Sequence, residues 1–149
     1  MLDPENPSVA YRLGRLFATL EKILWRLCER VSARLKSGDL SGSTITLKLK
    51  TADFRQRTRS QSLAAPTQLA ARIFSTAREM LARETDGTAF RLIGAGVSAL
   101  RPGAEADDHD LLDRRSAHAE RAMDDVRRKF GNAAVMRGLV YEGPAKDEA

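Results

Sequence analysis

The sequence is poor in the residues that most often carry chemistry or cross-link a fold. Its 149 residues include one cysteine and two histidines, and Phe, Trp and Tyr together make up 5%. A single cysteine excludes an internal disulfide framework and metal sites built from paired cysteines. This residue, Cys28, falls in a stretch with helical apolar periodicity. We therefore expect a small buried side chain there, with a reactive thiol as the alternative.

Long apolar runs are missing as well, since no stretch approaches the roughly 18 residues that a membrane-spanning helix requires. The N-terminus also lacks the pattern of a secretion signal. We therefore expect a cytoplasmic protein that has no membrane partner. The length suffices for one domain and a tail. The net charge of +5 favours an anionic partner, although where the charges lie matters more than their sum.

Apolar periodicity predicts the order helix, strand, strand, helix, strand. Apolar residues recur every three or four positions over 8–36, which is typical of a helix. Residues 43–50 alternate with period two, and the β-like stretch 54–63 follows after a short turn, so these two segments form a hairpin. An amphipathic helix over 66–84 and a strand over 89–100 complete the pattern.

The first helix carries a continuous apolar stripe, formed by Leu13, Phe17, Leu20, Leu24, Leu27 and Val31. We expect this stripe to pack in the core. A coiled-coil dimer is the alternative, although the repeat spans barely three heptads. Gly14 weakens the first turns, so a start near Thr19 is the alternative to a start near Ser8.

The segment RLIGAGVSALRPG, residues 91–103, contains the spacing of a dinucleotide-binding fingerprint. That fingerprint requires a helix to begin directly after the glycine turn, because the helix N-terminus binds the pyrophosphate. Pro102 and Gly103 prevent a helix there, so we reject the dinucleotide reading. We expect instead a strand in which Gly94 and Gly96 keep the surface low for the approach of another backbone.

An α+β fold accounts for the whole order, with an antiparallel sheet of three to four strands and two helices on one face. On the first strand, the residues that alternate with the apolar ones are Thr44, Thr46, Lys48 and Lys50. An uncovered sheet face of hydroxyl and basic side chains without aromatic residues is poor for stacking unpaired bases. It suits the phosphates of a nucleic-acid duplex, with an ordinary solvated face as the alternative.

The last part of the chain is strongly charged. We expect an acidic loop over 102–113 and a charged helix over 115–130. Three acidic residues of the loop are expected to form a solvated linker and not a metal site: Asp107, Asp108 and Asp110. His109 and His118 lie too far apart in sequence to suggest a metal pair, and we expect no metal and no cofactor.

Three segments resemble the little finger domain of Y-family DNA polymerases, in particular the bacterial DNA polymerase IV type. They are TITLKLKTADFRQRTRSQSL, PTQLAARIF and FRLIGAGVS, which stand in family order and at family spacing from about Leu20 to about Gly138. The resemblance implies a sheet with helices on one side, whose open face enters the major groove and holds template–primer phosphates. It also implies a role in translesion synthesis and DNA repair.

The resemblance further implies which residues contact phosphates: Thr44, Thr46, Lys48, Lys50, Thr58, Arg59, Ser60, Ser62 and Arg91. Gly96 and Gln61 stand where relatives often carry basic residues, and both departures should weaken binding. The resemblance divides the chain into an extension or helix start over 1–18, a DNA-binding domain over 19–101, and a linker, charged helix and tail over 102–149.

Nothing in the sequence resembles the palm carboxylates that hold two metal ions for phosphoryl transfer in this family. We therefore expect a non-catalytic module whose partner is duplex or template–primer DNA. The family's first strand should precede Leu20, where residues 7–18 either extend the helix or form a poor strand. Without that strand a sheet edge is unpaired, and a homodimer through this edge or through the N-terminal helix becomes an alternative.

Leu111 and Leu112 stand where relatives carry a short peptide that binds the sliding clamp. A leucine pair that anchors the linker to the domain is the alternative reading. Two other functions therefore stay open beside DNA binding. One is a protein-interaction adaptor that dimerises or binds the clamp, and the other is a remnant of a longer polymerase gene.

Overall fold

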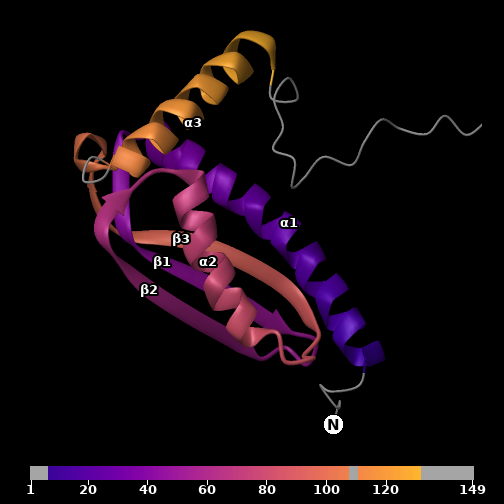
Figure 1. The fold of residues 1–149 in the computed structure, drawn as a ribbon. Helices are drawn as coiled ribbons and strands as arrows, with labels where there is room; N and C mark the ends of the chain where they lie inside the picture. The colour runs from indigo at the N-terminus through magenta and orange to yellow at the C-terminus, as the bar shows by residue number, and fades with distance from the viewer. Residues whose placement is uncertain (1–6, 108–110, 132–149) are drawn as a thin grey trace, which may run out of the picture.

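The computed structural model describes the backbone of residues 7–107 and 111–131, and the side chains of residues 17–107 and 115–131. The elements are α1 (Pro7–Ser37), β1 (Leu40–Thr51), β2 (Gln56–Thr67), α2 (Ala70–Glu84), β3 (Phe90–Pro102), the 3-10 turn η1 (Gly103–Glu105) and α3 (Leu111–Phe130). The strands form one antiparallel sheet of three in the order β2-β1-β3. α1 and α2 lie over the same face of the sheet, and α3 stands at one end (Figure 1). The predicted α+β arrangement is confirmed.

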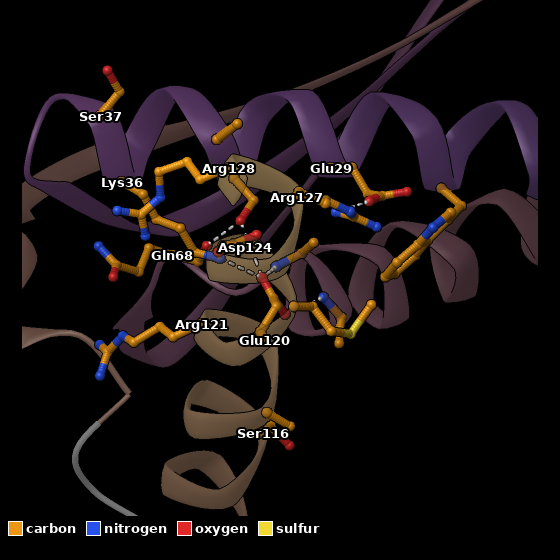
Figure 2. A pocket seen from close by; sticks show the side chains of 17 residues that line it. Glu29, Lys36, Ser37, Gln68, Ser116, Glu120, Arg121, Asp124, Arg127 and Arg128 are labelled. Carbon is orange, nitrogen blue, oxygen red and sulfur yellow. Dashed lines mark hydrogen bonds and ion pairs between the residues drawn. The ribbon is translucent and has the colours of Figure 1, made fainter. Parts of the chain in front are cut away.

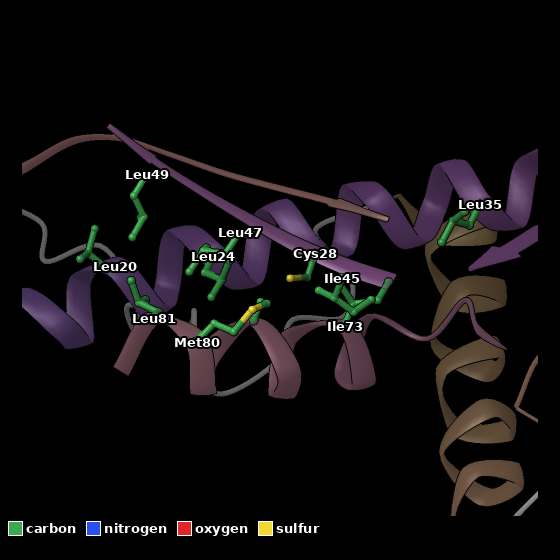
Figure 3. Packing of buried hydrophobic residues seen from close by; sticks show 11 residues of the cluster. Leu20, Leu24, Cys28, Leu35, Ile45, Leu47, Leu49, Ile73, Met80 and Leu81 are labelled. Atoms are coloured by element: carbon green, nitrogen blue, oxygen red, sulfur yellow. The ribbon is translucent and has the colours of Figure 1, made fainter. Parts of the chain in front are cut away.

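The core lies between the central strand β1 and the two covering helices. Ile45, Leu47 and Leu49 are 0%, 0% and 1% exposed, which confirms the alternation predicted for this strand. They pack against buried residues of α1 and α2, among them Leu24 and Ile73 (Figure 3). Burying a side chain of this size contributes about 1.5–3 kcal/mol, so this alternation supplies much of the stability.

Cys28 belongs to this core, as predicted. Its side chain is fully buried and packs with the apolar residues of α1, β1 and α2. Burial raises the pKa of the Cys28 thiol to about 12, with a smaller contribution from the neighbouring charge of Glu29. The thiol therefore stays protonated at neutral pH and serves as a small apolar side chain.

The structure decides one boundary that the sequence pattern left open and corrects another. The α1 helix begins at Pro7, so residues 7–18 extend the helix and do not form a strand. β2 continues to Thr67 and α2 begins at Ala70, so the predicted helix start at residue 66 or 67 is wrong. The physical reason is that the Thr67 hydroxyl accepts the Leu69 N–H at 3.1 Å and donates to Asp107 at 2.6 Å, which ends the strand there.

Asp107 corrects the expectation of a solvated acidic linker. Its side chain is 3% exposed, and it accepts the Thr67 hydroxyl and, at 3.1 Å, the Gln68 N–H. It therefore ties the end of the sheet to the start of α2. Asp108, His109 and Asp110 lie outside the described residues. α3 begins at Leu111, earlier than the predicted residue 115, so the acidic loop is shorter than expected.

Glu120 of α3 completes the N-terminus of α2. Leu69 at the N-cap position of α2 offers no side-chain hydrogen bond. The carboxylate of Glu120 accepts the Ala70 N–H at 2.8 Å and the Lys36 ammonium at 2.9 Å instead. An acidic group at a helix N-terminus satisfies unpaired N–H groups and complements the helix dipole. The charged tail helix thereby docks on the domain by supplying a cap that the sequence of α2 lacks.

Further ion pairs hold the same contact. Lys36 also reaches Asp124 at 2.6 Å, and Arg127 pairs with Glu29 of α1 at 2.8 Å (Figure 2). Between α1, the first turn of α2 and α3 lies a cavity of about 930 Å³. Its wall combines apolar residues such as Trp25 with these charged groups. The docking of α3 thus depends more on charge and hydrogen bonds than on tight apolar packing.

The cap predicts a stability difference between two carboxylates of the same helix. We expect Glu120→Ala to lower the free energy of unfolding by about 1–3 kcal/mol, because the Ala70 and Ala71 N–H groups lose their acceptor and Lys36 keeps only Asp124 as a carboxylate partner. Asp125 pairs with Arg128 on the exposed side of α3, so Asp125→Ala should cost less than about 0.5 kcal/mol. Urea unfolding followed by circular dichroism measures both. Equal losses in the two variants would contradict the role of Glu120.

Candidate nucleic-acid interface

The sheet face opposite α1 and α2 is lined with small polar side chains and lysines. We call it the open face. Strand register assigns its members, because residues directly opposite each other in an antiparallel pair point to the same side. Thr44 faces Ser62 and Ser98, Thr46 faces Ser60 and Gly96, and Lys48 faces Thr58 and Gly94 on the two neighbouring strands.

Seven of the predicted phosphate-contacting residues therefore share the open face: Thr44, Thr46, Lys48, Lys50, Thr58, Ser60 and Ser62. The hydroxyls of Thr46 and Ser60 lie 3.0 Å apart, so they hydrogen bond across the strands. Each hydroxyl keeps further donor or acceptor capacity toward solvent. The centre of the face is thus a row of small groups able to hydrogen bond to an approaching backbone.

The glycines of β3 leave space on this face. A Cβ atom added to Gly96 would meet nothing within 4 Å, and one added to Gly94 would meet only the Lys48 Cβ at 3.8 Å. Neither glycine has a positive φ, so neither is required by the backbone. By contrast, a Cβ on Gly42 would lie 2.3 Å from Val97 Cγ1. Gly42 is therefore needed for packing, whereas Gly94 and Gly96 leave the open face without projecting side chains at their positions.

β3 continues unbroken through both glycines to Pro102, and η1 follows. The glycine turn and the helix that a dinucleotide site requires are thus replaced by an extended strand. This confirms the reading of the segment as a strand.

The basic residues of the hairpin divide into two groups. Arg57 and Arg59 lie opposite Leu49 and Leu47 in the register, on the side of the helices. There they pair with Glu84 of α2 at 3.2 Å and 2.7 Å. Arg59 was expected to contact phosphates together with Thr58 and Ser60. The structure places it on the other side of the sheet, where a carboxylate already compensates its charge.

Three other basic side chains differ from Arg57 and Arg59, which are paired with Glu84. Within residues 17–107 and 115–131, Lys48, Lys50 and Arg91 have no carboxylate partner. A lysine or arginine that lacks an internal counterion presents its full charge to solvent and to any anion that arrives. These three cations, all in the predicted set, are the uncompensated basic residues of the hairpin and β3 in this part of the chain. Lys48 and Lys50 lie on the open face, and Arg91 adjoins Leu92, which pairs with Lys50 in the register.

Phe54 was missed by the sequence analysis. It lies in the turn between β1 and β2, and its side chain is 63% exposed. The Arg91 guanidinium lies 4.1 Å from the centre of its ring, and the Lys50 ammonium lies 5.5 Å from it. A lone aromatic residue beside a turn, inside a strongly basic stretch, is the signal that could have revealed it.

The turn beside Phe54 also carries a carboxylate. The hydroxyl of Thr51 donates to Asp53, and this hydrogen bond is the main reason that the pKa of Asp53 is held below its usual range. Asp53 also pairs with Arg55 at 3.3 Å, where both side chains are largely exposed. The negative charge at the turn is thus paired with Arg55.

The structure adds little about the other features that the sequence analysis considered. Across the parts of the chain that it describes, no three His, Cys, Asp or Glu side chains gather as metal ligands. None of the helices in those parts is long and apolar enough to cross a membrane. The backbone of Leu111 and Leu112 lies in the first turn of α3, and their side chains lie outside the described residues.

Comparison with known proteins identifies the region that carries this face. Residues 10–113 match the impB/mucB/samB family C-terminal domain. The chain is 51% identical to DNA polymerase IV of Brucella melitensis over 125 residues, which cover 82% of this chain and 28% of the relative. It is 50% identical to DNA polymerase IV 1 of Mesorhizobium japonicum over 150 residues, covering 94% and 34%. The corresponding protein of Caulobacter vibrioides is 45% identical, with coverage of 83% and 31%. The chain thus spans about a third of the length of these relatives.

The contrast between the glycines can be tested by stability alone. We expect Gly96→Arg to leave the free energy of unfolding within about 0.5 kcal/mol of the parent, because its side chain enters open space. Gly42→Ala should cost about 1–3 kcal/mol, because its Cβ would overlap Val97 and the Ser98 carbonyl. Urea unfolding of both variants is the measurement. A large loss in Gly96→Arg would show that packing, and not surface access, requires that glycine.

Proposed function

The chain belongs to the impB/mucB/samB family through its C-terminal, little finger domain, and on that basis we propose that it grips duplex or template–primer DNA through the open face. In this proposal the hydroxyls and lysines of the face hold phosphate oxygens, which carry no sequence information. Binding is therefore independent of sequence. Thr44, Thr46, Thr58, Ser60 and Ser62 act as neutral donors, and Lys48, Lys50 and Arg91 supply the charge.

The observation that carries the proposal is the sorting of charges between the two sides of the sheet. Glu84 compensates Arg57 and Arg59 on the helix side, whereas Lys48, Lys50 and Arg91 have no carboxylate partner among the residues whose side chains the structure describes. Gly94 lies opposite Lys48 and Gly96 lies opposite Thr46, and both glycines leave room for a backbone to come close. A neutral solvated face would need neither the uncompensated charge nor the low glycine surface.

Arg59 enters the proposal differently from the other predicted residues. β2 is an edge strand, and the Arg59 side chain is 51% exposed although it is paired with Glu84. It can contact a phosphate only from the edge and only in competition with that carboxylate. We therefore assign the main electrostatic grip to Lys48, Lys50 and Arg91.

Catalysis is assigned elsewhere in the relatives. The chain spans about a third of their length, and we infer that residues 19–101 form a non-catalytic DNA-binding domain. In this proposal residues 1–18 are an extension and 102–149 a linker, helix and tail. A polymerase reaction would require the two metal ions and carboxylates of the other domains. We also propose a part in translesion synthesis and DNA repair in the cytoplasm, which the similarity to relatives named DNA polymerase IV supports.

An adaptor role is the second candidate, favoured by one feature of the sheet. β3 lies at a sheet edge in the order β2-β1-β3, so one side of its backbone is available to another strand. A second copy of the chain could pair there or along α1, and Leu111 and Leu112 could bind a sliding clamp. Sedimentation of the chain and of a Leu111→Ala/Leu112→Ala variant with the clamp tests this role. If the chain sediments as a monomer and does not bind the clamp, the adaptor role is ruled out.

The DNA proposal predicts a salt dependence that comes from specific cations. Anisotropy of a labelled template–primer duplex across a salt series should give a log–log slope of about 0.9 per neutralised phosphate. We expect Lys48→Ala/Lys50→Ala/Arg91→Ala to lower that slope by about 2–3 and to weaken binding equally on unrelated sequences.

The matched control removes the same charge from the paired arginines. Arg55→Ala/Arg57→Ala/Arg59→Ala should change the slope by less than about 1, because carboxylates already compensate these side chains. Circular dichroism verifies that both triple variants are folded. If the two triple variants lose the same slope, net charge alone drives binding and the open face is not the grip.

A gain of binding provides an independent test. We expect Gly96→Arg to tighten duplex binding and to raise the salt slope by about 1, because it adds one cation to the centre of the open face. The same anisotropy series measures this change. Unchanged or weaker binding in the folded variant would mean that DNA does not lie over Gly96.

A further inference from the structure

The Phe54 side chain is largely exposed and does not belong to the hydrophobic core. Its side chain is 63% exposed, while the core takes Phe74 and Phe90 as partly buried members. Its φ is 67°, in the left-handed region that an L side chain rarely adopts. Such a conformation is unfavourable for an L residue and persists where the surroundings enforce it.

The turn enforces this conformation through Thr51. The Phe54 N–H donates to the Thr51 carbonyl at 3.0 Å, and the Arg55 N–H donates to the Thr51 hydroxyl at 3.0 Å. The Ala52 N–H donates to the Ala89 carbonyl at 2.9 Å, which anchors the turn to the start of β3. The ring is thus presented from a rigid turn and not from a free loop.

Cations and apolar surface surround the ring. The Arg91 guanidinium lies 4.1 Å from the ring centre and the Lys50 ammonium lies 5.5 Å from it, and both distances are within the range of a cation–π contact. Leu92 pairs with Lys50 in the sheet register and is 60% exposed. We call Lys50, Phe54, Arg91 and Leu92 the aromatic corner. It differs from the hydroxyl and glycine centre of the open face, which has no aromatic side chain.

The aromatic corner lies at one end of the open face. From Thr44 to Lys50 the open face extends roughly 20 Å at about 3.3 Å per residue, and the corner consists of the Lys50–Leu92 pair at that end together with Arg91 and the ring of the following turn. Bases inside a duplex are stacked on one another and cannot reach a protein ring. Single-stranded bases can stack on an aromatic side chain or on a guanidinium plane, while a cation holds the adjoining phosphate.

We propose that the aromatic corner binds an unpaired nucleotide next to the duplex, its base stacked on the Phe54–Arg91 pair and its phosphate held by Lys50. This inference rests on the proposed DNA binding of the open face and adds a preference to it. The chain recognises the junction at which a duplex gives way to a single strand. The sequence analysis expected a face that is poor for stacking bases, and Phe54 changes that expectation at one end only.

The test compares three labelled DNA probes bound to the full chain. One is a blunt duplex, one carries a short single-stranded overhang, and one carries the same overhang without bases. We expect the overhang to tighten binding about tenfold over the blunt duplex, since each base stacked on an aromatic ring contributes about that factor or more. The overhang without bases should lose that gain. A 2-aminopurine at the first unpaired position should be quenched on binding.

Three variants assign the effect to the ring. Phe54→Leu should abolish the overhang preference and the quenching while blunt-duplex affinity stays unchanged. Phe54→Trp should retain both, because it restores an aromatic plane. Phe130 is 75% exposed and is the last residue of α3, a helix whose C-terminal end lies away from the sheet (Figure 1). Phe130→Leu should therefore behave like the parent and is the matched control.

The outcomes separate this inference from the proposed function. Equal affinity of the parent for blunt and overhang probes, with salt-dependent binding to both, overturns the junction site and leaves the duplex grip in place. A preference that survives in Phe54→Leu also overturns it. If the parent binds neither probe at low salt, the proposed function itself fails, and the junction site fails with it.

Discussion

The rest of the structure depends on the two-residue alternation of β1. This strand is central in the sheet, so both of its edges are paired and each of its faces has a separate environment. Ile45, Leu47 and Leu49 are almost completely buried under the helices, which directs the intervening threonines and lysines to the open face. A shift of register by one residue would place Lys48 in the core, so burial strongly specifies the register. The same alternation along β1 therefore decides both which residues form the core and which residues form the candidate interface.

Ion pairing, more than the number of basic residues, decides which positive charges of this molecule are available to an anion. The net charge of +5 is modest for a chain with 25 basic residues, and several of them lie within reach of a carboxylate. Glu84, which is largely buried, pairs with both Arg57 and Arg59 on the helix side. Because those charges are compensated, the cations of the open face dominate the local potential of the sheet. The position of one glutamate on α2 thus decides which arginines of β2 are available to an anion.

Two carboxylates, the buried Asp107 and the partly buried Glu120, join segments that are far apart in the sequence. Asp107 binds Thr67 and the Gln68 N–H, and Glu120 caps the N-terminus of α2 while it pairs with Lys36. Both lie after β3, in the part of the chain that composition marks only as charged. They connect the start of α2 to the C-terminal segment and so give α3 a structural role. The family match ends at residue 113, so most of α3 lies beyond it.

The sequence by itself determined the order of the elements, the side of β1 that is buried, the burial of Cys28 and the continuity of β3 through its glycines. These features follow from periodicities of two or of about 3.6 residues and from local stop signals, which need no knowledge of distant contacts. Only the tertiary structure decided that Arg59 faces Glu84, that Asp107 is buried, that Glu120 caps α2 and that Phe54 meets Lys50 and Arg91. Each of these depends on which partner the fold brings to a side chain from 25 to 50 positions away or across a turn, and a linear pattern carries no information about that partner.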